Sequence, residues 1–228
     1  MSVLFQLNGV KKFYTQRTGL FRKKTAPVLD GVDMEIHRNR VNGLTGPSGA
    51  GKSTLARLLL KLEGWDDGDI LLRGRSIREI PNKDYYRHNR IMFQNPYSVV
   101  NPRFSVEKII TEPLRITGID RDAINRRLGE LLDLVGLPDS LLERRPHQVS
   151  GGQLQRAVLA RTLSTEPEFI VLDEPFSSLD EGLARQLARD FKKIFRRLGL
   201  TVLLISHHRQ RMRAMADSEA RLEGGKIF

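Results

Sequence analysis

The stretch that decides the fold of this 228-residue chain is GPSGAGKS, residues 46–53. It fits the pattern G-x-x-x-x-G-K-[ST] at every fixed position. We expect a short strand at residues 41–45, before the loop, and a helix from Ser53 to about Leu62, after it. Glycines let backbone N–H groups converge on phosphate oxygens, and the helix directs its positive N-terminus at the same anion. The pattern therefore predicts a nucleoside triphosphate site rather than a chance glycine-rich turn.

The side chains of this loop indicate a nucleoside triphosphate as the ligand and Mg²⁺ as the cofactor. Lys52 supplies a positive charge to the β- and γ-phosphates, and the hydroxyl of Ser53 is a ligand for Mg²⁺. The residues expected to contact the nucleotide here are Gly46, Pro47, Ser48, Gly49, Ala50, Gly51, Lys52, Ser53 and Thr54.

A second element is the apolar run Phe169–Leu172, which is followed by Asp173 and Glu174. Such a run is typical of a buried parallel strand, and ligands bind at the carboxyl ends of such strands. We expect Asp173 to hold Mg²⁺, directly or through water, and Glu174 to polarise the attacking water as general base. Without the loop at 46–53, an ordinary strand end with a solvated acid pair would be the better interpretation.

The third element is VSGGQ at residues 149–153, which resembles the signature of the ATP-binding-cassette (ABC) family, whose usual form begins with Leu. Small residues with free N–H groups open a helix here, which is again an anion-binding device. The alternative is a plain helix cap, because Ser150 is a good N-cap residue by itself. The resemblance implies that Ser150, Gly151, Gly152 and Gln153 contact the ATP held by a partner subunit.

Other residues match further landmarks of the same family. Gln94, after a short apolar strand, resembles the Q-loop glutamine, which would contact Mg²⁺ or the attacking water. His207 resembles the switch histidine that contacts the γ-phosphate, although His208 beside it makes the match less unique. Asp180 ends a stretch that resembles the D-loop, and this implies a position near the nucleotide. Tyr14 resembles the aromatic residue that stacks on adenine, although a lone tyrosine near a strand end is more often a packing residue.

The resemblance implies an α/β fold: a P-loop NTPase core of ABC type with a mainly parallel sheet, N-terminal antiparallel strands and an inserted α-helical subdomain. Residues 1–228 would form a single ABC ATPase domain, with the nucleotide-binding core at about 1–94 and 166–228 and the helical subdomain at about 95–165. The residue pattern itself predicts individual elements. Strands are expected at 3–8, 28–36, 41–45, 169–172 and 201–205, helices at 53–62, 105–117, 121–135, 151–164 and 181–198, a loop between the first two strands, and a terminal hairpin at 221–228.

Several stretches resemble the oligopeptide and nickel importer branch of the family. They are Gly19–Phe21, Phe93–Ser98, Asn101–Arg103, Glu112–Arg115 and Arg145–Gln148, and the helix from Ser53 to Glu63 is most similar to nickel-import ATPases. The branch implies a head-to-tail dimer with a second ABC ATPase subunit, beneath two membrane permeases that an extracytoplasmic solute-binding protein supplies. It also implies a peripheral position on the cytoplasmic side of the cell (inner) membrane. As cargo we expect nickel, free or chelated, ahead of short peptides.

The charge of the chain leaves one alternative open. There are 38 basic and 27 acidic residues, a net charge of +11, which suits an anionic partner such as nucleotide, nucleic acid or a membrane surface. A nucleic-acid-associated ABC ATPase would fit this charge, but such proteins usually carry two cassettes or a long coiled coil. This sequence has one cassette and no sustained heptad, so we expect nucleic acid not to be a partner. No apolar run approaches the ~20 residues that span a bilayer, and the lack of cysteine excludes disulfides.

Overall fold

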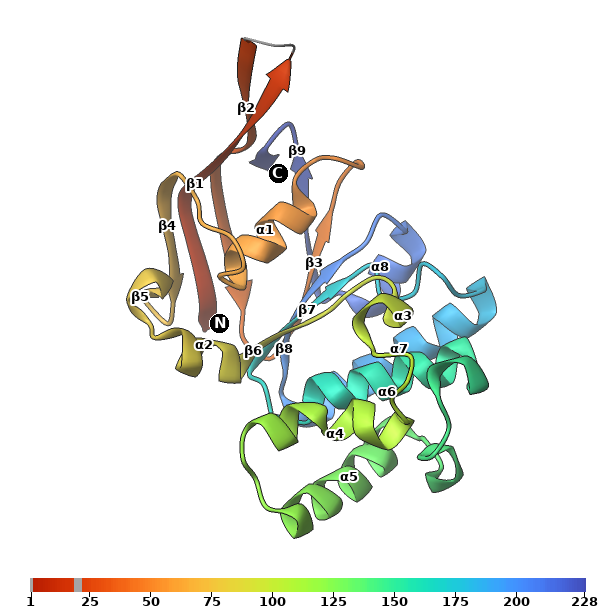
Figure 1. Cartoon of the computed structure of the whole chain (residues 1–228). Coiled ribbons are helices and arrows are strands. Elements are labelled where there is room, and N and C mark those ends of the chain that lie inside the picture. Colours follow the sequence, from red (N-terminus) through yellow and green to blue (C-terminus); the bar gives the residue numbers. More distant parts are fainter. Residues whose placement is uncertain (1, 19–21) are drawn as a thin grey trace.

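The computed structural model describes residues 2–18 and 22–228, arranged as two sheets with helices packed between and around them (Figure 1). The stretch Gly19–Phe21, one of those that resemble the importer branch, lies outside the described residues. The structure matches the predicted α/β fold with N-terminal antiparallel strands.

The first sheet is antiparallel, with the strand order β2-β1-β4-β5. Its strands are β1 (Val3–Thr18), β2 (Arg22–His37), β4 (Asp67–Leu72) and β5 (Arg75–Ser76). The predicted loop between the first two strands is wrong, because β1 and β2 pair along most of their length and Thr18 lies opposite Arg22. Gly9 and Gly31 have positive φ angles beside shifts in the register, so bulges interrupt the alternation of side chains without ending the ladder. The end of this hairpin projects from the rest of the molecule in Figure 1.

The second sheet has six strands in the order β10-β9-β3-β8-β7-β6. They are β3 (Val41–Thr45), β6 (Asn89–Met92), β7 (Phe169–Asp173), β8 (Thr201–Ile205), β9 (Ser218–Glu223) and β10 (Lys226–Ile227). Neighbours from β9 to β6 pair in parallel, and β10 pairs with β9 through the predicted terminal hairpin. The carboxyl ends of β3, β7 and β8 therefore meet at one edge, where this class of sheet binds ligands.

The helices are α1 (Lys52–Leu59), α2 (Asn82–His88), α3 (Pro96–Val99), α4 (Val106–Ile116), α5 (Arg121–Val135), α6 (Gly151–Leu163), α7 (Glu181–Leu198) and α8 (Arg209–Met215). Those from α4 to α7, and the start of α1, lie close to the predicted ranges, whereas α2, α3 and α8 were not predicted. All residues from 95 to 165 are described, and none of them lies in a strand, as the sequence predicts for this segment. The division of the chain into core and subdomain remains a prediction.

Helix α1 ends before the predicted boundary at Leu62. Lys61 takes a left-handed conformation with φ 53°, which an α-helix cannot continue through. The carbonyl of Lys61 instead accepts a hydrogen bond from the Tyr86 hydroxyl at 2.9 Å, and its ammonium donates to the carbonyl of Ile80 at 2.8 Å. Contacts with α2 and the turn before it therefore override the apolar pattern that predicted a longer helix.

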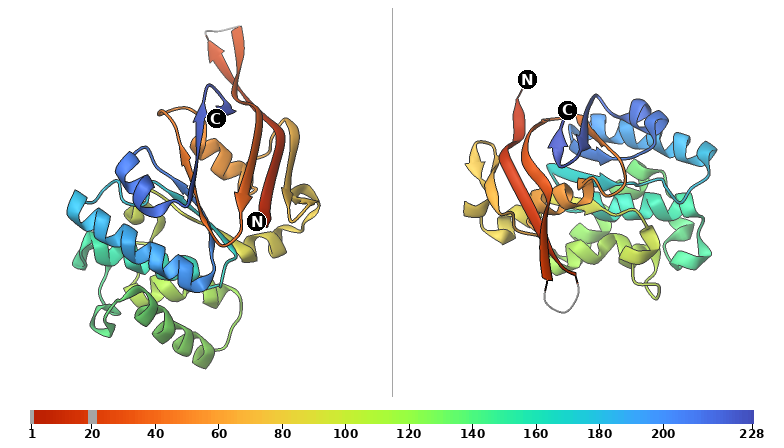
Figure 2. Two further views of the ribbon diagram at one scale, coloured as in Figure 1. Left: turned by 180° about the vertical axis from the view of Figure 1, so that it is seen from behind. Right: turned by 90° about the horizontal axis from the view of Figure 1, so that it is seen from above.

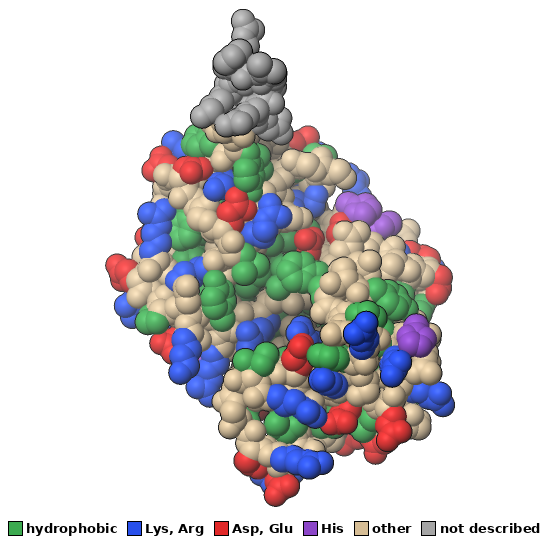
Figure 3. All heavy atoms as spheres, viewed as in Figure 1, with side chains coloured by type: hydrophobic (Ala, Val, Ile, Leu, Met, Phe, Trp, Pro, Cys, Tyr) green, Lys and Arg blue, Asp and Glu red, His purple; other side chains and the backbone are tan. Residues whose placement is uncertain are grey.

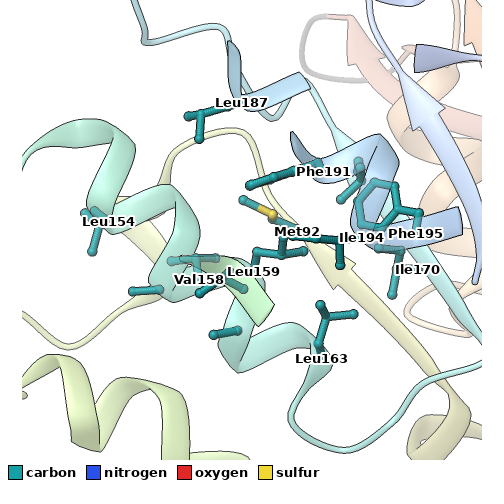
Figure 4. Packing of buried hydrophobic residues seen from close by; sticks show 14 of the residues in the cluster. Met92, Leu154, Val158, Leu159, Leu163, Ile170, Leu187, Phe191, Ile194 and Phe195 are labelled. Carbon is teal, nitrogen blue, oxygen red and sulfur yellow. The ribbon is translucent and has the colours of Figure 1, made fainter. Parts of the chain in front are cut away.

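Two hydrophobic clusters hold the layers together, one on each face of the parallel sheet. Successive residues of β7 alternate between them: Phe169 and Val171 pack with α1 and the antiparallel strands, whereas Ile170 and Leu172 pack with the helices on the other side. Figures 1 and 2 show α1 between the antiparallel strands and the parallel sheet. On the opposite face, side chains of α6 and α7 meet Met92 and Ile170 (Figure 4). The phosphate loop and the end of β7 are therefore fixed by packing on both sides of the sheet.

Candidate functional site

The predicted phosphate loop leaves the carboxyl end of β3 and leads directly into α1. Its glycines are needed for packing as well as for phosphate access. Gly46 has φ 148°, and a Cβ placed there would lie 2.1 Å from the carbonyl oxygen of Leu222. Gly51 has φ 103°, and its Cβ would lie 2.9 Å from the carbonyl oxygen of Val28. Any side chain at either position would displace the loop from β9 or β2.

The N-terminus of α1 has no side-chain cap, because its N-cap residue is Gly51. Its first-turn N–H groups therefore need an acceptor from outside the helix, and phosphate oxygens are suitable. The ammonium of Lys52 donates to the carbonyl oxygens of Gly46 (2.8 Å) and Pro47 (2.9 Å), so it lies directly over the loop. The loop thus offers free N–H groups at the start of α1 and a positive charge over Gly46 and Pro47. A triphosphate needs both kinds of group to bind its negative oxygens.

Asp173 is the last residue of β7 and pairs with Ile205 of β8. Burial raises the pKa of its carboxyl group above the usual value, and the neighbouring Glu174 raises it further. The nearby Ser53 hydroxyl opposes this rise, as does the charge of Lys52. The two residues predicted to hold Mg²⁺, Ser53 and Asp173, line the same pocket. A hydroxyl and a partly buried carboxylate are hard oxygen donors, which fit Mg²⁺.

Glu174 and His207 form the most closely connected pair in the site. The carboxylate of Glu174 accepts hydrogen bonds from the backbone N–H of His207 (2.8 Å) and the hydroxyl of Ser206 (3.1 Å). The same carboxylate oxygen lies 2.5 Å from Nδ1 of His207. Glu174 also has φ 48°, a strained angle for a residue with a side chain, and its N–H donates to the carbonyl of Ile205. The carboxylate is therefore held in one orientation at the edge of the sheet.

Gln94 reaches the same region from the end of β6. An open pocket of about 1070 Å³ is lined by Gln94 together with Ser53 and Asp173. The predicted Mg²⁺ residues thus share one hollow, and the amide of Gln94 lies on its wall. A second pocket of about 540 Å³ is lined by Gly46, Pro47 and His207 among others. Gln94 and His207 therefore each line a pocket that also includes residues of the phosphate loop.

Tyr14 lies on β1 near the C-terminal end of α1, within a network that the sequence did not predict. Its hydroxyl donates to Glu63 at 2.5 Å and lies 3.4 Å from a guanidinium nitrogen of Arg57. The ammonium of Lys12 is 5.4 Å from the centre of its ring. Arg57 also lines the pocket that holds Gln94. Adenine stacking by Tyr14 remains a prediction. The network could have been suspected from the sequence only because Arg57 and Glu63 follow the phosphate loop.

The signature segment lies apart from this site. Ser150 caps α6: its hydroxyl accepts from the N–H of Gln153 at 3.2 Å, and its own N–H donates to the Gln153 side chain at 2.8 Å. Among the described residues that line the pocket with Ser53 and Asp173, none belongs to 150–153. Asp180 is likewise a helix cap, since its carboxylate accepts from the N–H of Leu183 at 2.9 Å. One chain therefore assembles the phosphate loop, the two acids, Gln94 and His207, but leaves the signature segment outside.

Comparisons with known proteins show what this chain is similar to. The family model described as ABC transporter matches residues 29–177. The oligopeptide transport ATP-binding protein OppF of Lactococcus lactis is 39% identical over 233 residues, which cover all of this chain and 73% of that protein. The nickel import ATP-binding protein NikE of Pseudomonas putida is 38% identical over 92% of this chain and 78% of its own length. A solved dimer of the ATP-binding cassette MJ0796, bound to ADP and phosphate, shares the fold with a TM-score of 0.81 at 23% identity, covering 98% of this chain and 96% of that one. None of the helices in the described part of the chain is long and apolar enough to cross a membrane.

Proposed function

This chain belongs to the ABC transporter family, and we propose that it is the ATP-hydrolysing subunit that energises a membrane importer for short peptides or nickel. As a member of this family it binds ATP and couples its hydrolysis to transport. The observation that carries the proposal is the meeting of the Lys52 loop, the Ser53–Asp173 pair and the Glu174–His207 pair at one edge of the parallel sheet. Each residue there has a task in phosphoryl transfer to water.

The phosphate loop binds the triphosphate. The first N–H groups of α1 would donate to the phosphate oxygens, and so would the ammonium of Lys52, which lies over the loop. Ser53 and Asp173, with Gln94 beside them, are the residues that would hold Mg²⁺. The ion would neutralise charge on the phosphates. Positioning and charge stabilisation are the main contributions that a protein makes to this reaction.

Glu174 is the proposed general base. Its carboxylate would accept a proton from the attacking water while the hydrogen bonds from Ser206 and His207 keep it oriented. His207 would contact the γ-phosphate through the side of the imidazole that does not face Glu174. That side is accessible, because the His207 side chain is 53% exposed whereas that of Glu174 is 12% exposed.

The separate position of residues 150–153 supports a head-to-tail dimer with a second ABC ATPase subunit. In such a dimer the Ser150 segment of one subunit would complete the ATP site of the other, with Asp180 at the same interface. The small residues Gly151 and Gly152 at the start of α6 leave its N–H groups open to an anion. A second copy of this chain and a related subunit would both use these contacts.

The importer partners follow from the relatives. We propose two membrane permease subunits, an extracytoplasmic solute-binding protein that supplies them, and a peripheral position on the cytoplasmic side of the cell membrane. The identities with the peptide and nickel relatives, 39% and 38%, are nearly equal, so the cargo is proposed as either class. The relatives give no support to a nucleic-acid-associated ATPase. On the face seen in Figure 3, basic side chains are interspersed with acidic ones and do not merge into one broad basic surface.

Uptake measurements test the proposal directly. A strain that lacks this gene should lose uptake of either radioactive nickel or a labelled short peptide. The wild-type gene should restore that uptake and Lys52→Ala should not, because the variant lacks the ammonium that binds the phosphates. The matched control is Lys83→Ala, which removes a lysine from α2, away from the phosphate loop. Unchanged uptake of both cargos in the deletion strain would refute the importer role, and full rescue by Lys52→Ala would refute the phosphate site.

A further inference from the structure

Arg211 is a buried cation close to the switch histidine. It lies in α8, which begins two residues after His207, and its side chain is only 7% exposed. Burying a guanidinium costs free energy unless its charge and its N–H groups find partners. The partners of Arg211 therefore show which parts of the chain it holds together.

Both partners of Arg211 lie on the segment that follows Glu174. One terminal nitrogen donates to the carbonyl oxygen of Phe176 at 2.8 Å, and the other donates to the carboxylate of Glu181 at 2.9 Å. Phe176 is buried just after Glu174, and Glu181 is the first residue of α7. The hydrogen bond from Arg211 holds the pKa of the Glu181 carboxyl below its usual value, so the pair stays charged. One side chain of α8 thus fastens both ends of the segment 176–181.

The same segment packs against the start of α6. A Cβ placed on Gly151 would lie 3.1 Å from the Leu179 side chain, and one placed on Gly152 would lie 3.2 Å from the Leu183 side chain. These distances leave no free space between α7 and the signature segment. Because packed interiors transmit displacement instead of absorbing it, a shift of residues 176–183 would also shift the N-terminus of α6.

We propose that Arg211 is a positioning residue that links His207 and Glu174 to the signature segment of the same chain. His207 senses the γ-phosphate in one ATP site, and residues 150–153 contribute to the other site of the proposed dimer, on which this inference rests. A movement of His207 passes to α8, from Arg211 to Phe176 and Glu181, and from there through Leu179 and Leu183 to α6. The two ATP sites are coupled in this way through one charged side chain.

The test separates this role from a simple contribution to stability. In the full-length Glu174→Gln protein, ATP should drive formation of a stable dimer, which size-exclusion chromatography measures, while fluorescent ATP analogue titration measures binding to the monomer. Adding Arg211→Met should leave monomer binding within about threefold and weaken the ATP-driven dimer by about 5- to 150-fold, the usual range of coupling between sites. Glu181→Ala should have a similar effect, and the two changes together should be no worse than Arg211→Met alone.

The matched control is Arg185→Gln. Arg185 also pairs with Glu181, at 3.6 Å, and donates to the Glu181 carbonyl, but its side chain is 56% exposed. This variant should dimerise like its parent. Arg211→Lys keeps the charge but cannot donate to Phe176 and Glu181 from two separate nitrogens, so its dimerisation should be intermediate. Together with Glu181→Ala, it replaces Arg211→Met if that variant does not fold.

Three outcomes would overturn the link: unchanged dimerisation in both Arg211→Met and Glu181→Ala, additive effects of the two, or equal losses of monomer binding and dimerisation. If the Glu174→Gln parent binds ATP and forms no dimer, the proposed dimer of two copies of this chain fails, which is a separate result.

Discussion

Replacing Glu174 with Gln tests the proposed general base with little change in shape. The wild-type carboxylate accepts hydrogen bonds from the Ser206 hydroxyl and the His207 N–H. A glutamine can keep its carbonyl oxygen towards His207 and turn its NH₂ group to donate to the Ser206 oxygen, because a hydroxyl both accepts and donates. The polar groups around residue 174 therefore remain paired, but the side chain can no longer take a proton.

The expected magnitudes differ enough to separate catalysis from folding. Loss of a positioned base lowers the rate by about 10²–10⁴, which corresponds to a barrier higher by about 2.7–5.4 kcal/mol. Loss of the charge on two or three hydrogen bonds that remain paired should change the free energy of unfolding by about 1–2 kcal/mol at most. Binding of ATP should hardly change, since Lys52, Ser53 and Asp173 are intact.

Three measurements check this reasoning: phosphate release under saturating ATP, fluorescent ATP analogue binding, and the urea midpoint of unfolding. Glu219→Gln is a matched control, because Glu219 is an exposed carboxylate that lines the second pocket with His207 and has no assigned role. It should hydrolyse ATP at the wild-type rate. Hydrolysis by Glu174→Gln within about threefold of wild type would refute the assignment and make His207 the next candidate base.

Three further predictions concern the dimer, the permease contact and stability. Gly151→Leu should leave ATP binding to the monomer nearly normal and abolish hydrolysis by the assembled complex; turnover at the wild-type rate would reduce the segment to a helix cap. Tyr97→Ala or Arg103→Ala should retain ATP hydrolysis while uptake falls, because Tyr97 is 51% exposed in the segment after Gln94; equal losses of both activities would indicate packing instead of coupling. Asp217→Asn should destabilise the protein by about 1–2 kcal/mol at neutral pH in urea unfolding, since its carboxylate accepts from the N–H of Val41 and pairs with Lys192. Burial opposes ionisation of Asp217, but these contacts hold its pKa below the usual value, so its contribution is present above about pH 4 and is lost as the pH falls below that; an equal loss at pH 7 and pH 2 would contradict this.

The parts of the site that the sequence predicted are those encoded over a few consecutive residues. The loop at 46–53 and the strand end at Asp173 are local sequence patterns, and each has one physical interpretation. The structure places the loop directly before α1 and Asp173 at the end of β7, as predicted. The contacts of Tyr14 with Glu63 and Arg57 join residues far apart in the chain. No periodicity reports such contacts, because they depend on how β1 packs beside α1.

The long N-terminal hairpin shows a different reason for a missed element. Its strands contain bulges at Gly9 and Gly31, and it projects from the body of the protein, so its residues do not alternate cleanly between apolar and polar. The sequence predicted a loop here because a strand is recognised by alternating apolar and polar residues, and this alternation arises only where one face of the strand is buried. A β-ladder supported mainly by backbone pairing leaves no such pattern in the sequence.

The position of Lys52 shows what a loop motif cannot reveal by itself. The motif predicts a lysine charge for the phosphates, but the structure shows this charge already paired with the carbonyls of Gly46 and Pro47. These contacts, and the packing that excludes a Cβ at Gly46 and Gly51, hold the loop in one shape. A loop held in this way loses less conformational entropy when it binds a ligand. The loop residues proposed to bind the phosphates therefore lie in one packed corner between β3 and α1, whereas those expected to sense hydrolysis, Gln94 and His207, lie in the connections that follow β6 and β8.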